Sequence, residues 1–381
     1  MKLGVCAFFQ WGDDVVDRPD NTDELTTASL MHWWVTNRGK VYYYDDRVKD
    51  YDTVFHSSPT FYQHSMRESV FRSMRNEGNP QGLISIVSPG AGFPEIDALV
   101  VRWRWDTGRD EDEYILGRQK DVVTHYISKK TPVYIWDEDF QFDFPDWISK
   151  EDYDNIVCPF RIQEGETDGF KSVHHIPLYD EPLKKMLDFE FRFPYNNFGD
   201  CKDPTHLITY IGNNYDRDHA LSEYILKIAL SYPRLVQLYG NWVKYPKAPM
   251  FSILATLRKL SRVCLHPKVD KSGIEFIYSK SFFVPMIAKD EYFNVGHMTP
   301  RLFEVLCSGA IPIPFTEFFN FKRFYGEFAF ANAKHFFDFW GDSWDIFQNQ
   351  EKYTKMYRYV LNHVIESNIF SVEDFVKGVG L

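Results

Sequence analysis

Short apolar runs alternate along the chain with longer segments whose apolar residues recur at helical spacing, and turn-forming residues separate them. Several of the short runs are apolar at every position, which is typical of parallel strands covered by helices on both faces. We therefore expect an α/β fold with mostly parallel sheets. The expected strands cover residues 2–9, 40–44, 51–55, 96–103, 131–136, 155–158, 173–176, 207–211, 235–239, 262–265 and 283–287. The expected helices cover residues 23–37, 67–77, 113–128, 217–232, 273–281 and most of 344–375.

Residues 181–206 interrupt this alternation, because they are rich in Pro, Asp and Phe and have weak periodicity. We interpret them as a linker between a Rossmann-like domain at 1–180 and a second one at 207–345. Residues 346–381 are expected to form C-terminal helices that pack on the outside. Two doubly wound domains bind ligands at the carboxyl ends of their strands, so we expect the active site in the cleft between them.

The segment TPRLFEVLCSGAIPIP at 299–314 predicts a short helix followed by a strand. Thr299 can cap the helix and Pro300 suits its first position, where the missing N–H costs nothing. Ser308 and Gly309 end the helix, and the two prolines that follow restrict the strand to a sheet edge or a strand end.

Arg301 and Glu304 lie three residues apart in this segment and therefore on one face of the helix. A helix N-terminus with an added arginine can bind a diphosphate, and a carboxylate one turn later can bind a pair of ribose hydroxyls. The alternative interpretation is an ordinary i,i+3 ion pair on a helix of an α/β domain.

Glycine-containing turns follow the first two expected strands of the C-terminal half. Gly212 and Asn213 follow the first strand, with Arg217 nearby, and Gly240 follows the second. Glycine lets the backbone approach a phosphate closely, and Arg217 can reach the same anion. A plain βα turn without a ligand would have the same pattern.

Three acids, Asp137, Glu138 and Asp139, follow an expected strand of the N-terminal half. A carboxylate at a strand end can act as the general base on an acceptor hydroxyl. The alternative is a solvated acidic loop.

Composition narrows the classes of function. The 381 residues are 44% apolar and 18% aromatic, which argues against disorder, and the chain has no apolar run long enough to span a membrane. The five cysteines form no CxxC pair, and the start of the chain is too short for a signal peptide, as expected for a cytosolic protein with reduced thiols.

The net charge is −11; residues 1–180 carry 19 Lys and Arg against 32 Asp and Glu, a balance of −13. Such a surface repels a polyanion, which weighs against nucleic-acid binding.

Two other patterns favour structural roles. His174 and His175 have no spaced metal-ligating partners, so we assign no metal site, and no need for a divalent ion is indicated. Arg102-Trp-Arg-Trp105 alternates basic and aromatic residues, which can bind a nucleic-acid strand, but Arg on one face of a strand and Trp on the other is more often structural. The sequence has no Walker loop and no GxGxxG motif.

In combination, these features resemble the DNA β-glucosyltransferases of T-even phages. The resemblance is strongest at Arg301 and Glu304, and a shift of one residue in the acidic run would align Glu138 in place of Asp137. It departs from the family at the phosphate loop, where the family has two arginines and this chain has only Arg217. The motifs that carry it are Thr299-x-Arg301-x-x-Glu304 with Ser308, Ile208-Thr-Tyr-Ile-Gly212, Gln237-Leu-Tyr-Gly-Asn241 and Tyr134-Ile-Trp-Asp137.

The resemblance implies two Rossmann-like domains in the GT-B arrangement, a UDP-sugar donor and, in a phage-infected cell, transfer to 5-hydroxymethylcytosine in double-stranded DNA. Asp137 would be the base of an inverting reaction, Arg301 and Arg217 would bind the diphosphate, and Glu304 would bind the ribose. The sugar is glucose or a pentose such as arabinose. The alternatives are a GT-B enzyme with a glycan or small-molecule acceptor and a non-catalytic binding protein.

Overall fold

The computed structural model contains two compact units, and each is described by itself. Unit 1 consists of Met1–Pro59, Phe71–Tyr179 and Phe370–Leu381, and unit 2 consists of Thr60–Val70 and Asp180–Ile369. The structure describes residues 1–7, 22–45, 82–108, 110–165, 169–188, 204–212, 217, 225, 229, 233–240, 264–269, 271–314, 323 and 349–381.

The described part of unit 1 contains a seven-stranded parallel sheet in the order β3-β2-β1-β4-β5-β6-β7. The first strand pairs with both β2 and β4, with Leu3 opposite Val41 on one side and Ala98 on the other. The order therefore reverses between β1 and β4, as in a doubly wound Rossmann sheet. The strands are β1 (Leu3–Cys6), β2 (Val41–Tyr44), β3 (Ile84–Ile86), β4 (Ala98–Arg102), β5 (Val133–Trp136), β6 (Val157–Ile162) and β7 (Lys171–Val173).

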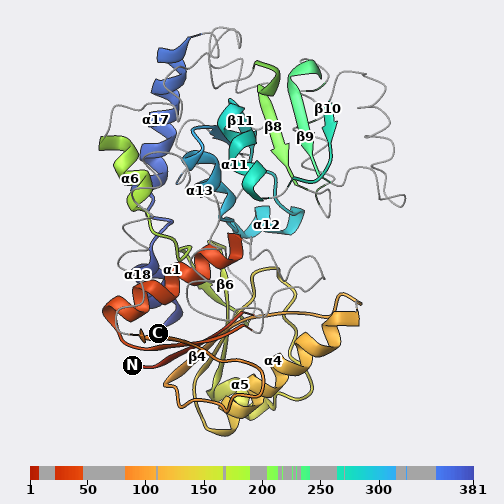
Figure 1. Cartoon of the computed structure of the whole chain (residues 1–381), viewed down its shortest axis with the longest axis vertical. Coiled ribbons are helices and arrows are strands. Elements are labelled where there is room, and N and C mark those ends of the chain that lie inside the picture. Colours follow the sequence, from red (N-terminus) through yellow and green to blue (C-terminus); the bar gives the residue numbers. More distant parts are fainter. Residues whose placement is uncertain are drawn as a thin grey trace. The chain divides into compact units, whose positions relative to one another are not determined.

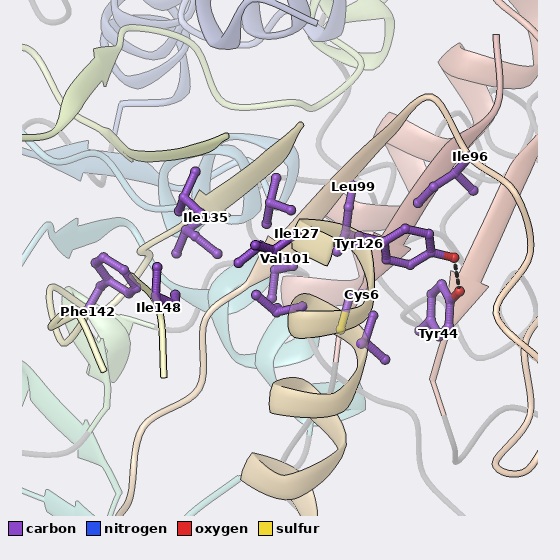
Figure 2. Packing of buried hydrophobic residues seen from close by; sticks show 14 of the residues in the cluster. Cys6, Tyr44, Ile96, Leu99, Val101, Tyr126, Ile127, Ile135, Phe142 and Ile148 are labelled. Atoms are coloured by element: carbon purple, nitrogen blue, oxygen red, sulfur yellow. Dashed lines mark hydrogen bonds between the residues drawn. The ribbon is translucent and has the colours of Figure 1, made fainter. Parts of the chain in front are cut away.

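Helices cover both faces of this sheet. In Figure 1, α1 (Thr22–Asn37) and α18 (Val372–Val379) lie on one face, and α4 (Asp110–Ser128) and α5 (Lys150–Asn155) lie on the other. Figure 2 shows apolar side chains of β4, β5 and α4 packed together in the core. The hydroxyl oxygens of Tyr44 and Tyr126 lie 2.5 Å apart within this core, and Tyr126 Oη donates to Pro94 O at 2.7 Å.

Unit 2 contains a smaller parallel sheet, whose described strands have the order β10-β9-β8-β11-β12. The order reverses between β8 and β11. The strands are β8 (Ile208–Ile211), β9 (Val236–Tyr239), β10 (Cys264–His266), β11 (Phe283–Pro285) and β12 (Ile311–Ile313). The α-helices bounded in the described part of unit 2 are α6 (Glu181–Asp188), α11 (Lys271–Lys280), α12 (Asp290–Val295), α13 (Arg301–Cys307) and α17 (Gln350–Glu366).

The helix and strand predicted at 299–314 are confirmed as α13 and β12. Pro300 is the N-cap residue of α13 and has helical φ and ψ. No side-chain hydrogen bond caps the helix at this residue, so the capping expected of Thr299 is not observed there. Ser308 ends the helix and Gly309 follows with φ +73°. Strand β12 pairs with β11 at the edge of the described sheet, as its prolines require.

Some elements differ from the expected ones. The segment interpreted as a linker begins with α6, an amphipathic helix that buries Pro182, Leu183 and Met186. Strand β6 extends to Ile162, and the short elements β3, α5 and α12 were not expected. Residues 346–381 were assigned together, whereas the structure groups Phe370–Leu381, which include α18, with unit 1. The elements expected at 51–55 and 67–77, and most of the helix expected at 217–232, lie outside the described residues. In the part of the chain that the structure describes, no helix has the length and apolarity needed to cross a membrane.

Candidate active site

The reversal point of the sheet in unit 2 is where ligands bind in open parallel sheets, beyond the carboxyl ends of the strands. Gly212 directly follows β8, and its N–H donates to Tyr239 O at 2.9 Å. Arg301 Nη1 donates at 3.4 Å to the carbonyl oxygen of Ile287, which lies just beyond β11. The glycine and the arginine that the sequence analysis selected thus lie at the same edge of the sheet.

Arg301 is half-buried beside two tyrosines. Its Cζ lies 5.4 Å from the ring centroid of Tyr210. Burial alone would lower the pKa of Arg301, but the nearby Tyr278 and Tyr210 raise it above its ordinary value. Glu304 adds to this rise, and a hydrogen bond between Arg301 and Tyr210 contributes as well. Arg301 therefore keeps a full positive charge in a poorly solvated place, where it interacts strongly with an anion.

Glu304 lies one turn after Arg301 and exposes only 6% of its surface. Burial raises the pKa of the neighbouring Tyr278 hydroxyl, although the charge of Arg301 opposes the rise. The carboxylate and the guanidinium share one environment with the two tyrosine rings.

Gly212 packs closely against the side chain of Tyr210. A Cβ atom added to Gly212 would lie 2.6 Å from Tyr210 Oη and 2.9 Å from its Cζ, so the tyrosine ring would have to shift. Tyr210 thus lies next to both Gly212 and Arg301.

The other residues that the sequence analysis selected for donor binding are Gly240, Thr299, Arg217 and Asn213. Gly240 follows β9 with φ +146°, and its N–H donates to His266 O at 3.2 Å. Thr299 and Arg217 are half-buried, and Asn213 lies outside the described residues.

In unit 1, the acidic run follows β5, which lies beside β4 and the reversal point. Asp137 exposes 2% of its side chain. Its Oδ1 accepts the N–H groups of Gln141 at 2.9 Å and Phe142 at 3.1 Å. Its Oδ2 accepts Arg161 Nε at 2.7 Å, and Arg161 Nη2 also lies at 2.7 Å. The alternative interpretation, a solvated acidic loop, is wrong for this residue, because its carboxylate is inside the protein and bound on both oxygens.

Arg161 lies on β6 between two aromatic rings. Its Cζ is 4.5 Å from the centroid of Phe140 and 3.6 Å from that of Phe170. Phe140 itself has φ +61°, a left-handed conformation that is uncommon for a residue with a side chain. The turn from Asp137 to Phe142 is thus held by a carboxylate, a guanidinium and stacked rings.

Glu138 forms a second ion pair, with Arg102 at the end of β4. Arg102 is almost fully buried, donates to Thr27 Oγ1 of α1 at 3.1 Å and lies 4.9 Å from the ring centroid of Trp136. Glu138 exposes 24% of its side chain, against 2% for Asp137. Each of the two acids after β5 is therefore paired with its own arginine.

The remaining candidates have structural partners. Trp103 stacks near Phe142 and Trp147, with ring centroids 4.8 and 6.1 Å away. His174 Nδ1 lies 3.4 Å from Glu164 Oε2. The described residues contain no group of three or more His, Cys, Asp or Glu side chains arranged to bind a metal ion.

Sequence reasoning did not find Arg161, Tyr210 or Tyr278. Arg102 was noted only as part of an alternating strand. The chain separates Arg161 from Asp137 by 24 positions, and their pairing depends on β5 and β6 being neighbours. Tyr210 lies at an apolar strand end and looks like a core residue, so the only available signal was its position two residues before Gly212.

Comparison with solved structures finds full-length similarity to phage sugar transferases. The T4 phage β-glucosyltransferase has a TM-score of 0.56 at 13% identity, with 100% of both chains covered. An α-glucosyltransferase solved with UDP-glucose and DNA containing an abasic site has a TM-score of 0.57 at 9% identity, with 99% of this chain and 98% of that chain covered. The T4 enzyme was also solved with UDP and Mn²⁺, at a TM-score of 0.56 and 14% identity. No protein-family model matches the sequence, and no curated protein matches it.

At sequence identities of 9–14% the similarity to these solved structures shows the fold, and the two parallel sheets with their Rossmann-type strand orders agree with it. The chain therefore has the GT-B fold of the phage glucosyltransferases.

Proposed function

We propose that this protein is a glycosyltransferase that moves a sugar from a UDP-sugar to the hydroxyl of 5-hydroxymethylcytosine in DNA. The observation that carries the proposal is that Arg301 and Gly212 both lie next to Tyr210 at the reversal point of the unit 2 sheet, with the buried Glu304 one turn after Arg301. A half-buried, charged arginine is suited to a diphosphate, and a carboxylate one turn away is suited to ribose hydroxyls. Two proteins of the same fold were solved with UDP or UDP-glucose, which supports this choice of donor.

The proposed reaction is an inverting displacement. The acceptor oxygen bonds to the anomeric carbon as the bond from that carbon to the diphosphate breaks, and the bonding electrons leave with UDP. Arg301 stabilises the negative charge of the departing diphosphate, with Arg217 as a further donor. A carboxylate of the pair Asp137 and Glu138 takes the proton of the acceptor hydroxyl.

The proposed acceptor is double-stranded DNA with the modified base flipped out of the stack, which exposes its hydroxyl. Support comes from the α-glucosyltransferase of the same fold that was solved with DNA. The proposed sugar is glucose or a pentose such as arabinose.

Mass spectrometry tests the proposal directly. Hydroxymethylcytosine DNA is incubated with a panel of UDP-sugars and digested to nucleosides, with cytosine DNA of the same sequence as the control. We expect a nucleoside whose mass increases by one sugar residue, only with the modified DNA and only with some donors. Absence of any such product across the panel would contradict the DNA assignment.

A second candidate is a glycosyltransferase with a glycan or small-molecule acceptor. The balance of −13 over residues 1–180 favours it, because that half of the chain repels a polyanion. Measuring duplex-DNA affinity against salt separates the two candidates. A DNA enzyme loses affinity as salt rises, with a negative log–log slope, and the second candidate has no measurable affinity at any salt concentration.

A further inference from the structure

Asp137 and Glu138, the first two acids after β5, differ in how much of the side chain is exposed. The side chain of Asp137 exposes 2% of its surface, whereas that of Glu138 exposes 24%. An acceptor hydroxyl must come within hydrogen-bond distance of its base. Exposure therefore favours Glu138 as the group that an acceptor can reach.

Both oxygens of Asp137 already have strong donors. Two backbone N–H groups, those of Gln141 and Phe142, donate to Oδ1 at 2.9 and 3.1 Å. Arg161 occupies Oδ2 through Nε and Nη2, both at 2.7 Å. A carboxylate with four such contacts can take a proton only if a charged, well-aligned hydrogen bond is broken, which is costly at a buried site.

Arg161 cannot easily move away to release that oxygen. Its guanidinium lies between the rings of Phe140 and Phe170, 4.5 and 3.6 Å from their centroids. Phe140 has a left-handed backbone, φ +61°, which persists only where surrounding contacts hold it. Asp137 and Arg161 both contact this turn, Asp137 through the N–H groups of Gln141 and Phe142 and Arg161 through the ring of Phe140.

We propose that Asp137 and Arg161 are a positioning pair that fixes the turn at 137–142, and that this turn presents Glu138 as the proton acceptor. This inference rests on the proposed function and deepens it. The acceptor O–H proton moves to the Glu138 carboxylate while the new sugar–oxygen bond forms and the bond to UDP breaks. Arg102, on the neighbouring strand, pairs with Glu138 and sets the direction of its side chain.

Five variants test the proposal: Glu138→Gln, Asp137→Asn, Arg161→Met, the double variant Asp137→Asn/Arg161→Met, and Asp139→Asn as the matched control. Three readouts are taken from each variant. They are kcat against pH for transfer to hydroxymethylcytosine DNA, hydrolysis of the UDP-sugar without acceptor, and hydrogen exchange of the peptide that covers residues 137–142.

We expect Glu138→Gln to lower kcat by about 10² to 10⁴-fold, to remove the fall of kcat at acid pH and to leave exchange at 137–142 unchanged. Asp137→Asn and Arg161→Met should each lower kcat by roughly tenfold, keep the acid limb at the same pH and speed exchange at 137–142. Because both changes break one pair, the double variant should be about as slow as either single variant. Asp139→Asn should resemble the wild type in all three readouts.

Two results would overturn the inference. If Asp137→Asn removes the acid limb while Glu138→Gln keeps it, Asp137 is the base. If exchange at 137–142 stays at the wild-type rate in Asp137→Asn and Arg161→Met, the pair does not hold the turn.

Failure of the proposed function gives a different pattern. A wild-type protein that hydrolyses UDP-sugar but never modifies DNA has another acceptor, and the hydrolysis pH profiles of the same variants then decide between Glu138 and Asp137. A wild-type protein with neither activity overturns the proposed function and the role of Glu138 with it. The exchange rates then decide on the positioning pair alone.

Discussion

The hydroxyl of Tyr353 on α17 is expected to contribute measurably to the stability of unit 2. The side chain is fully buried, and its Oη lies 2.9 Å from two carbonyl oxygens, Phe282 O before β11 and Gly309 O after α13. One O–H group thus joins α17 to both ends of the segment that carries Arg301. Burial raises the pKa of this phenol, so it remains a donor at neutral pH.

Replacing Tyr353 with Phe removes the donor and keeps the ring. Loss of a buried hydrogen bond that leaves acceptors behind costs about 1–3 kcal/mol, and we expect about 2 kcal/mol here because two carbonyls share the hydroxyl. For a unit of this size that cost lowers the melting temperature by roughly 4–8 °C. Differential scanning calorimetry and urea unfolding followed by tryptophan fluorescence would measure it.

Tyr359→Phe is the matched control on the same helix. Tyr359 is half-buried and its ring lies 4.4 Å from that of His363, so this change should cost less than about 0.5 kcal/mol. A Tyr353→Phe protein as stable as the Tyr359→Phe protein would refute the reasoning, since the two buried contacts would then contribute nothing.

The remaining predictions concern pH and the donor site. Burial raises the pKa of Tyr44 and Tyr278 above the ordinary value of about 10, so above that pH the unfolded chain releases protons that the folded protein keeps. The free energy of unfolding should therefore fall as pH rises above about 10, and a flat profile of urea midpoints between pH 9 and 11 would contradict this. Arg301→Met should weaken UDP binding by about 10 to 100-fold in calorimetry, because a charged hydrogen bond to the diphosphate is lost; unchanged affinity would remove Arg301 from the site. Gly212→Ala should also weaken UDP binding, since its Cβ would displace the Tyr210 ring, whereas equal affinity would show that the ring moves without consequence.

Strands that consist of an apolar run were predictable from the sequence, and shorter or more polar elements were not. Strand β5 and helix α13 lie where their patterns predict, because each has a clear period and a clear end. Helix α5 was missed because its sequence, KEDYDN, has no buried residue and hence no apolar face. Helix α6 was missed because Pro182 was taken as a sign of a loop, although proline is well tolerated in the first turn of a helix.

The candidate site was predictable only in part, for a related reason. Arg301, Glu304 and Gly212 could be selected because each is chemically distinctive within its own segment. The ion pairs Asp137–Arg161 and Glu138–Arg102 join neighbouring strands, and strand order cannot be read from local spacing. The sequence therefore predicted acids at the end of β5 without showing that arginines neutralise two of them.

Helix α18 lies near the end of the sequence but belongs to unit 1, whose other described elements all come before residue 180. It contacts β7 and α1, and Gly380 O accepts the hydroxyl of Tyr134 on β5 at 3.1 Å. Unit 1 therefore takes its last helix from residues that leave the ribosome after all of Asp180–Ile369, while unit 2 uses nothing beyond Ile369. Domains usually fold in the order in which they are made, but here unit 1 lacks its last helix until the end of the chain is available. A released chain truncated after residue 369 should therefore show a protease-resistant unit 2 beside a unit 1 that is cleaved, and equal resistance of both units would contradict this.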